Sequence, residues 1–342
     1  MTGGLKVGVI GCGLIGNKRV EALDADDVVV AVFDVDASKA ATTAQQVGAI
    51  AADSIEQVLA ERPDVVVVAA THDQLAPITA ASLRAGADVL VEKPGGVTAG
   101  QIEAMLAVEH ATGRRVKVGF NHRFHPALQE LQAEVSSGTH GELMHLRARY
   151  GHGGRPGYDR EWRAEPSRSG GGELIDQGMH LIDLTHWIAG PLPLHSALLR
   201  TQFWDTDVDD NAALILGVGD SRVSPWAMLH VTWTEWKNMF SLEAYCRTAK
   251  LQVDGLVRSY GPQTLTIHRM APDLGPPATE VRTYGTEDLS WRAEWQEFKS
   301  AVADRQRPML GGLADALYAW QTVEAAYATS APYQAMRAQV GA

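Results

Sequence analysis

The stretch KVGVIGCGLIG, residues 6–16, decides how the first part of this chain folds. It begins as a β-branched run typical of a buried strand and continues into Gly11-x-Gly13-x-x-Gly16. Gly11 permits a tight turn, Gly13 lets backbone approach a pyrophosphate, and Gly16 allows a helix to pack closely on the strand. The pattern predicts a strand, a turn and a helix whose N-terminus can bind phosphate.

A second strand, VVVAVFD (28–34), ends at Asp34, about 20 residues beyond the glycine turn. A carboxylate at this place can accept hydrogen bonds from the ribose hydroxyls of an adenosine. It would also repel a 2′-phosphate, so NAD is favoured over NADP, although Arg19 and Lys39 lie nearby in sequence and weigh the other way. The alternative is a βα turn that binds no ligand, followed by a surface aspartate.

Short apolar runs alternate with helical patterns as far as Phe120, which is typical of a parallel sheet covered by crossover helices. The further runs are 65–71, 88–92 and 116–120, and helices are predicted over 14–24, 54–61, 73–85 and 98–112. We therefore predict an α/β fold with a doubly wound Rossmann domain over residues 1–121.

The pattern changes after residue 121. A helix over 127–136 precedes a strand-like run, GELMHLRARY, and an apolar helix over 173–190 follows. Further strands are predicted at 195–203, 211–218, 226–235, 238–246 and 263–270, with a last helix at 311–329 that packs back on the body. This order predicts a second, α+β domain over residues 122–342, built on a large, mainly antiparallel, open-faced sheet.

Composition excludes several classes of protein. A net charge of -11 argues against nucleic-acid binding, and two cysteines cannot form a disulfide framework or a cysteine-rich zinc site. No basic-then-apolar leader opens the sequence, and no apolar run approaches the roughly 20 residues that span a bilayer. We therefore expect a cytoplasmic protein that binds neither nucleic acid nor a membrane.

Two further elements carry residues suited to chemistry. Lys93 follows the strand DVLVE, at the edge of the sheet where ligands bind. On the apolar helix, Asp176 and His180 are spaced to share one face, and Asp183 lies one heptad from Asp176. Such residues need partners or a cavity, so either a site or a self-satisfied buried His–Asp pair would explain them. A metal site is disfavoured, because no complete ligand set accompanies them.

Together these segments resemble the Gfo/Idh/MocA oxidoreductases, the relatives of glucose-fructose oxidoreductase and inositol dehydrogenase. The resemblance covers nearly the whole chain and rests on GVIGCGLIG (8–16), ATH (70–72), EKPGG (92–96), VGFNHRFHP (118–126) and GGGELIDQGMHLIDLTHW (170–187). It implies that Lys93, Asp176 and His180 are the catalytic group. It also implies a homodimer or homotetramer that assembles through the second domain's sheet.

The implied reaction moves a hydride between a sugar-type secondary alcohol and nicotinamide. His180 would act as the acid/base, Lys93 would stabilise the charge on the reacting oxygen, and Asp176 would orient them. The expected cofactor contacts are Gly11, Gly13, Leu14, Ile15, Gly16, Asp34, Thr71, His72, Glu92, Lys93, Asn121, Trp162 and Arg163. The expected substrate contacts are Lys93, Asn121, His122, Arg123, Arg155, Tyr158, Asp176 and His180.

The loop before the apolar helix bears on the substrate. Arg155, Arg160, Arg163 and Arg168 could bind a phosphate or nucleotide-linked sugar, or could form a solvated loop whose acids balance them. The resemblance covers sugars, cyclitols, sugar phosphates and nucleotide sugars, and this loop favours an anionic or nucleotide-linked sugar. Two other functions stay open: a dinucleotide-binding regulator without turnover, and a reductase of a keto or imine substrate.

Overall fold

The computed structural model describes residues 3–217 and 224–340, and the chain forms two compact units. Unit 1 comprises Met1–Asn121 and Trp291–Leu317, and unit 2 comprises His122–Ser290 and Tyr318–Ala342. Within the described residues, no helix has the length and apolar character needed to cross a membrane.

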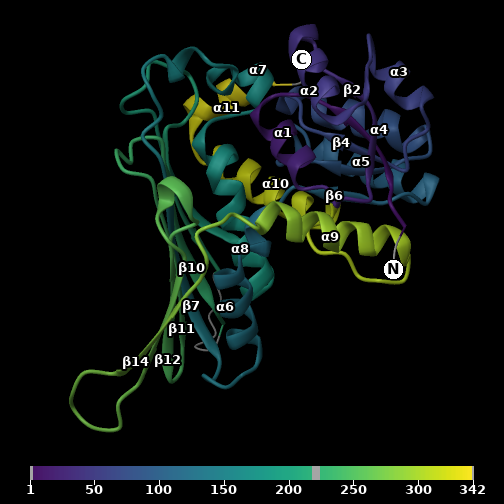
Figure 1. Ribbon diagram of the computed structural model, residues 1–342. Coiled ribbons are helices and arrows are strands. Elements are labelled where there is room, and N and C mark those ends of the chain that lie inside the picture. The colour runs from purple at the N-terminus through teal and green to yellow at the C-terminus, as the bar shows by residue number, and fades with distance from the viewer. Residues whose placement is uncertain (1–2, 218–223, 341–342) are drawn as a thin grey trace. The chain divides into compact units, whose positions relative to one another are not determined.

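Unit 1 is built on a six-stranded sheet with the strand order β3-β2-β1-β4-β5-β6, in which every pair is parallel. Its strands are β1 Lys6–Ile10, β2 Val28–Phe33, β3 Ile50–Ala51, β4 Val65–Val68, β5 Asp88–Val91 and β6 Val116–Val118. Its crossover helices are α1 Leu14–Glu21, α2 Ala37–Val47, α3 Ile55–Ala60, α4 His72–Arg84 and α5 Ala99–Thr112 (Figure 1). This doubly wound order confirms the predicted fold class.

The helix α9 (Ser290–Ala303) was not predicted, and most of it belongs to unit 1. Trp295 and Phe298 pack in the same core as β1 residues, and the Trp295 indole N–H donates to Asp27 at 2.7 Å. The predicted boundary between the domains did not foresee that Trp291–Leu317 belongs with the first 121 residues. The reason is long-range packing, which neighbouring residues do not reveal.

Unit 2 holds an eight-stranded sheet with the order β14-β13-β12-β11-β7-β10-β9-β8. The strands are β7 Leu143–Gly151, β8 Leu194–Arg200, β9 Asn211–Leu216, β10 Trp226–Thr232, β11 Met239–Cys246, β12 Ala249–Asp254, β13 Thr264–Arg269 and β14 Ala278–Thr283. Only the β7–β10 pair is parallel among these described strands, which confirms the mainly antiparallel sheet. β12 and β14 were not predicted, and position 218 of one predicted strand lies outside the described residues.

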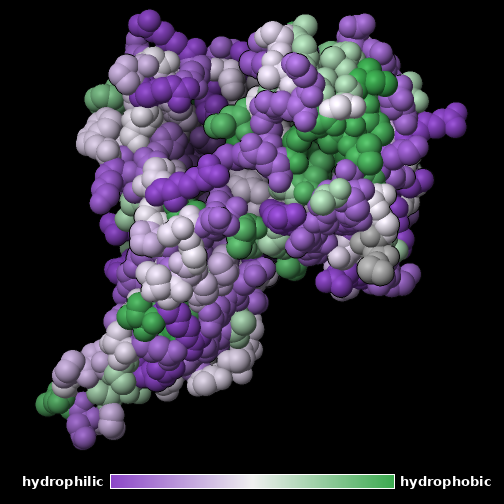
Figure 2. Space-filling view, in the orientation of Figure 1, coloured by the Kyte–Doolittle hydropathy of each residue, from purple (hydrophilic) through white to green (hydrophobic). Residues whose placement is uncertain are grey.

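Helices pack on one face of this sheet. α6 (Pro126–Ser136) contacts β11, β12 and β13, and α8 (Met179–Ala189) contacts β7 and β10. Side chains alternate between buried and more exposed along β10, β12 and β13, as expected where one sheet face is covered. Over β12 and β14 the residues in Figure 2 are mostly hydrophilic. The chain ends with α10 (Leu313–Tyr327) and α11 (Ala331–Arg337), so the helix predicted over 311–329 is not the last one.

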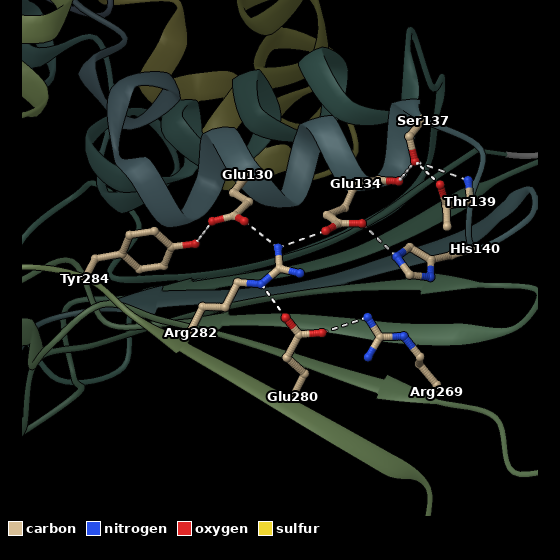
Figure 3. A network of polar contacts seen from close by, with 9 residues as sticks. All are labelled: Glu130, Glu134, Ser137, Thr139, His140, Arg269, Glu280, Arg282 and Tyr284. Atoms are coloured by element: carbon tan, nitrogen blue, oxygen red, sulfur yellow. Dashed lines mark hydrogen bonds and ion pairs between the residues drawn. The ribbon is translucent and has the colours of Figure 1, made fainter.

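A polar network fastens α6 to the edge strand β14 (Figure 3). The Arg282 guanidinium binds Glu130, Glu134 at 2.8 Å and Glu280 at 2.7 Å. Tyr284 also donates to Glu130, and His140 lies 2.9 Å from Glu134. Because β14 presents few buried apolar side chains, these charged contacts are what hold it against the helix.

Candidate functional site

The turn between β1 and α1 has the geometry that its glycines predict. Gly11 has a φ of +99°, and a Cβ there would lie 2.3 Å from the Ala69 carbonyl oxygen. A Cβ on Gly16 would lie 1.8 Å from the Gly11 carbonyl oxygen, so only glycine lets α1 begin this close to the strand. Nothing lies within 4 Å of the Cβ position on Gly13. This open stretch of backbone suits the close approach of a pyrophosphate.

Asp34 is bound directly to this turn. Its Oδ2 accepts the backbone N–H of Cys12 at 2.7 Å, and its Oδ1 accepts that of Asp36 at 2.8 Å. The two bonds orient the carboxylate beside the start of α1, where Leu14 is 77% exposed and Ile15 follows it. The carboxylate retains further lone pairs, so it can still accept from ribose hydroxyls.

Arg19, one of the two cations that could favour NADP, lies inside unit 1. Its side chain is 2% exposed and pairs with Glu92 at 2.6 Å and Glu294 at 2.5 Å. Lys39 lies on the surface and faces Asp36 at 3.4 Å. The Glu92 carboxylate accepts a hydrogen bond from Arg19, because burial requires a partner for each charge. Glu92 therefore supports the segment that carries Lys93. The cofactor contact that we expected of Glu92 stays a prediction.

The carboxyl ends of the parallel strands bring further predicted residues to one edge of unit 1. Thr71 occupies the N-cap position of α4, and His72 is the first residue of that helix and is buried. Lys93 follows β5 by two positions and precedes Pro94 through a cis peptide bond. Asn121, which is 4% exposed, follows β6. Since all these strands run parallel, their carboxyl ends lie at the same edge as the glycine turn.

In unit 2, the segment that carries Asp176 is not a regular α-helix. A π-helical turn spans Leu174–Gly178, and the α-helix α8 begins only at Met179. The prediction of one regular helix over 173–190 is therefore wrong at its start. π-turns are rare and occur frequently at functional sites, because they change where side chains point relative to the rest of the helix.

A buried aspartate anchors the start of this segment. The Asp209 carboxylate accepts the backbone N–H groups of Gly172 at 3.1 Å and Leu174 at 2.8 Å, and the Tyr327 hydroxyl at 2.5 Å. A Cβ on Gly172 would lie 1.9 Å from the Asp209 carbonyl oxygen, and one on Gly171 would lie 2.3 Å from the Tyr327 hydroxyl. The glycine run 170–172 is thus needed for this close approach.

Asp176 lies among polar and aromatic side chains of the preceding loop. The Tyr158 hydroxyl is 3.5 Å from its Oδ2, and the Arg163 guanidinium is 3.7 Å from the same oxygen. Burial, together with the charge of Asp176, raises the pKa of Tyr158 well above its ordinary value. The Asp176 side chain is 15% exposed, so it is accessible to a small ligand.

His152, Glu173 and Asp176 also form a group whose possible ligand atoms lie within 4.8 Å of one another. The Nδ1 of His152 accepts the backbone N–H of Gly154 at 3.0 Å. A neutral imidazole in that state carries its proton on Nε2, so the ring presents a donor to the carboxylates and no lone pair to a metal. The group is therefore better suited to hydrogen bonding than to metal binding.

His180 is buried, with 5% of its surface exposed, and it stacks on His122. The ring centroids are 3.8 Å apart and the planes are inclined by 19°. His125 lies edge-on to His122 at 5.4 Å, and Tyr150 is within 6.3 Å of His180. Two stacked imidazoles disfavour simultaneous protonation, because their positive charges would repel. The stack therefore leaves at least one of the two rings in the neutral form that can accept a proton.

Asp183, the third polar residue of the helix, has a separate role. It forms a bidentate ion pair with Arg123, with nitrogen–oxygen distances of 2.8 and 2.6 Å, and both side chains are almost fully buried. The guanidinium of Arg123 neutralises Asp183, and the substrate contact that we expected of Arg123 stays a prediction. The pair fixes the short helix 121–124 that also carries His122 against α8.

The arginines of the loop are mostly balanced by acids. Arg155 pairs with Glu161 at 2.6 Å, and Arg168 faces Glu165 at 3.4 Å. Arg163 lies near Glu161 as well as Asp176, and it stacks on Trp162 at 4.5 Å. These contacts support the solvated-loop interpretation over a phosphate-binding cluster.

Sequence reasoning missed Glu173 and His152, which lie near the predicted Asp176, and Asp209, which binds the backbone of Gly172 and Leu174. Glu173 stands three positions before Asp176 within the quoted motif, so it could have been included. Asp209 carries no such signal, because only folding brings a residue of a distant loop to the helix start.

Comparison with known proteins places these features in a family. Residues 5–120 match the model of the oxidoreductase family with an NAD-binding Rossmann fold, and residues 128–252 match the GFO/IDH/MocA C-terminal domain.

Among curated relatives, the chain is 31% identical over 216 residues to inositol 2-dehydrogenase 2 of Saccharopolyspora erythraea, covering 59% of this chain and 61% of that one. It is 32% identical over 192 residues to D-glucoside 3-dehydrogenase of Escherichia coli, covering 54% of each chain. These matches span less than two thirds of the relatives' own length.

Solved structures share the fold at lower identity. UDP-N-acetylglucosamine 3-dehydrogenase GnnA from Acidithiobacillus ferrooxidans superposes with a TM-score of 0.81 at 21% identity, over 96% of this chain and 98% of that one. KijD10, a 3-ketoreductase from Actinomadura kijaniata solved with NADP, gives 0.81 at 22% identity, over 95% and 97% of the two chains. Fold, motifs and family models agree, and the chain belongs to the GFO/IDH/MocA family of oxidoreductases with an NAD-binding Rossmann fold.

Proposed function

We propose that the protein is an NAD-dependent dehydrogenase that oxidises a secondary alcohol of a sugar or cyclitol. The observation that carries the proposal is the bond from Asp34 to the Cys12 backbone N–H, which holds a ribose-binding carboxylate at an intact dinucleotide turn. In the reaction, the carbon-bound hydrogen leaves as hydride, the hydroxyl proton goes to a base, and the alcohol carbon becomes a carbonyl carbon. The same groups serve the reverse reduction.

Unit 1 has the features that a bound dinucleotide requires. The open backbone at Gly13 and the start of α1 would hold the pyrophosphate, and Asp34 would hold the adenosine ribose. Thr71, His72, Lys93 and Asn121 of unit 1 would lie toward the nicotinamide end. The family resemblance also implies Trp162 and Arg163 as cofactor contacts. When bound, NAD supplies the carbon that accepts the hydride.

Three residues would carry the proton chemistry. His180 is the proposed base, since it is a buried imidazole that stacks on His122, one of the proposed substrate contacts. Lys93 would donate a hydrogen bond to the reacting oxygen and stabilise its developing charge. Asp176 would orient the substrate through the oxygen that faces Tyr158. Asn121, His122 and Tyr158 remain the proposed substrate contacts, and Arg155 is less favoured because it is bound to Glu161.

The substrate class follows from the relatives and from the loop. The named relatives act on inositol and D-glucosides, which are neutral polyhydroxylated rings. The ion pairs of Arg155 and Arg168 reduce the case for a phosphorylated or nucleotide-linked sugar. The proposed assembly is a homodimer or homotetramer in the cytoplasm.

The test is an NADH-absorbance screen across inositols, aldoses, methyl glycosides, uronates, sugar phosphates and nucleotide sugars. His180→Ala should lower turnover of the substrate found by roughly 10²–10⁴-fold, the usual effect of losing a positioned acid–base group. Lys93→Ala should lose turnover on a similar scale by removing charge stabilisation. NAD affinity should change little in His180→Ala.

The matched control is His195→Ala, since His195 is an exposed histidine of the same unit. It should retain parental turnover. A folded His180→Ala that also keeps parental turnover would remove His180 from the mechanism. Binding of NAD without oxidation or reduction of any compound in the screen would favour the regulator instead.

A further inference from the structure

A row of aromatic rings in unit 2 leads from Asp176 to the surface. Tyr158, whose hydroxyl is 3.5 Å from Asp176, has its ring centroid 5.8 Å from that of Trp204. Trp204 is followed by Phe203 at 5.0 Å, and Phe203 by Trp236 at 4.8 Å. Tyr158 is 6% exposed, whereas Phe203 is 58% and Trp236 66% exposed. The row therefore begins beside a proposed catalytic residue and ends with two rings open to solvent.

The loop that carries two of these rings is held in one conformation. The Asp210 carboxylate, which is fully buried, accepts consecutive backbone N–H groups from Gln202 at 3.0 Å, Phe203 at 2.8 Å and Trp204 at 3.1 Å. The Trp204 indole N–H donates to the Trp233 carbonyl at 3.1 Å. Rings on a pre-ordered backbone lose little freedom when they bind a ligand, which favours binding.

The same dipeptide connects this loop to the segment that carries Asp176. Asp209 binds the backbone at Gly172 and Leu174, immediately before the π-turn, while Asp210 binds the loop with Phe203. Because the two aspartates are adjacent, the exposed rings and Asp176 are held in a defined spatial relation.

Two glycines allow the backbone to pack closely on the indole rings. A Cβ on Gly153 would lie 2.9 Å from Cε3 of Trp236, and one on Gly154 would lie 2.8 Å from Cζ2 of Trp204. Gly154 also has a φ of +63°, which favours glycine. The backbone after β7 therefore packs directly on one side of the rings, and a larger residue would displace them.

The charges around the rings indicate which ligands fit. Asp205, Asp207 and Glu235 neighbour the rings in sequence, together with Lys237. Arg155, which follows Gly154, is paired with Glu161. An acidic setting of this kind repels phosphate and carboxylate groups. It suits a neutral ligand with hydroxyl groups that donate to carboxylates and with an apolar face that lies on an aromatic ring.

We propose that Phe203 and Trp236 form an accessory subsite for the second ring of a neutral glycoside. The sugar to be oxidised would lie at Asp176, and the ring attached through its glycosidic oxygen would stack on the exposed aromatic side chains. This inference rests on the proposed function, and it narrows the substrate from free sugars and cyclitols to glycosides. A second copy of the chain could also cover exposed rings, but the unbroken row from Asp176 favours a ligand.

The experiment measures binding and turnover of matched sugars. Glucose, galactose and mannose are compared with their phenyl glycosides and with disaccharides, by calorimetry in the presence of NADH and by initial rates with NAD. At least one glycoside should bind more tightly than its own monosaccharide. Trp236→Leu and Phe203→Leu should each weaken binding of that glycoside by about three- to tenfold, the scale of one aromatic contact. Binding of the monosaccharide should not change.

Two controls separate stacking from general hydrophobicity. Trp236→Phe keeps an aromatic face and should retain most of the glycoside preference. Leu274→Ala removes a still more exposed apolar side chain elsewhere in unit 2 and should change nothing. Both ring variants should also keep the parental mass in light scattering.

The outcomes separate the subsite from the proposed reaction. If glycosides bind more tightly through Trp236 but none is turned over, the subsite proposal is supported and the proposed dehydrogenase reaction is overturned. Turnover of monosaccharides with no glycoside preference would overturn the subsite alone. A change of mass in Trp236→Leu, with sugar binding unaltered, would show that the rings contact a second copy and would also overturn the subsite.

Discussion

We expect Asp34 to determine which of the two nicotinamide cofactors the protein prefers. Its carboxylate is fixed by Cys12 and Asp36, and a 2′-phosphate at that place would meet a negative charge. NADH should therefore bind more tightly than NADPH. Asp34→Ala should reduce the ratio of the NADPH and NADH dissociation constants by roughly tenfold, which corresponds to about 1.4 kcal/mol. Dissociation constants for both cofactors, from quenching of protein fluorescence, measure this. Equal affinities in the parent protein would contradict the assignment.

His125 makes stability depend on pH. Burial lowers the pKa of His125 to about 4, opposed in part by Asp288. Its Nδ1 lies 2.7 Å from Nε2 of Gln263, whose Oε1 accepts the Ala127 N–H, so Gln263 donates and the imidazole is held neutral. In the unfolded chain the same ring has a pKa of about 6.5.

The unfolded state therefore binds an extra proton between about pH 6.5 and 4, and the stabilisation present above pH 6.5 is lost as the pH falls through this range. The full loss is about 3 kcal/mol. In His125→Asn, which keeps an acceptor for Gln263, the free energy of unfolding in urea should fall less steeply over this range. Identical slopes for variant and parent would show that His125 is not the group responsible.

Single residues differed in how far they could be predicted from the sequence. Gly11, Gly13 and Asp34 belong to a local motif whose geometry follows from neighbouring residues, so their placement was foreseeable. Asp209 and Asp210 were not, because a carboxylate in a loop reads as solvated until packing buries it. Arg123 was placed near the substrate on resemblance, and its bond to Asp183 depends on two elements far apart in sequence.

At the scale of elements, the π-turn and its anchor deserve a direct test. Asp209→Asn would turn one carboxylate oxygen into an NH₂ group that faces donors from Gly172, Leu174 or Tyr327. A buried donor without an acceptor costs about 1–3 kcal/mol, so the free energy of unfolding should fall by that amount. Amide exchange over 172–178 should accelerate at the same time.

Asp207→Asn is the control, because Asp207 is an exposed residue of the same loop. It should leave both stability and exchange unchanged. Parental exchange in Asp209→Asn would mean that the glycine run holds the segment without the carboxylate.

The elements that sequence reasoning missed had weak or misleading patterns. β14 (ATEVRT) buries almost no apolar side chain, so alternation gave no signal, and its pairing with β13 and the network around Arg282 hold it in place. α9 does carry Trp291, Trp295 and Phe298 at helical spacing, and this pattern could have been recognised. The start of the site helix could not, because no propensity distinguishes a π-turn from an α-turn.

At the scale of the molecule, the uncovered face of the unit 2 sheet has two parts. Cross-strand pairing puts Ile215 and Arg147 on either side of Met228, and Glu243 opposite Arg147. Glu243 is nearly buried by Arg147 and Lys250. Burial alone would raise its pKa, but these hydrogen bonds lower the pKa of Glu243 to about 2. The middle of this sheet face, around Arg147 and Glu243, is therefore charged, and it adjoins an apolar end around Met228 and Ile215.

The apolar end is where we expect assembly. Leu198 on β8 is 52% exposed, and Trp226 and Met228 on β10 are 40% and 38% exposed, so they flank β9 on either side. Exposed apolar patches of this kind mark interfaces. A face that pairs with its own copy gives a closed, two-fold assembly. Light scattering at micromolar concentration should therefore give the mass of a dimer or tetramer.

Charges on this apolar end should separate the copies, because an interface cannot bury unpaired lysines without a large desolvation cost. Leu198→Lys combined with Met228→Lys should yield a monomer that still binds NAD, since both positions lie in unit 2 and the proposed dinucleotide residues of the glycine turn lie in unit 1. Leu274→Lys, at an exposed position outside the sheet, should keep the parental mass. A monomeric parent protein would refute assembly itself, whereas an oligomeric double variant would show that the copies meet through another surface.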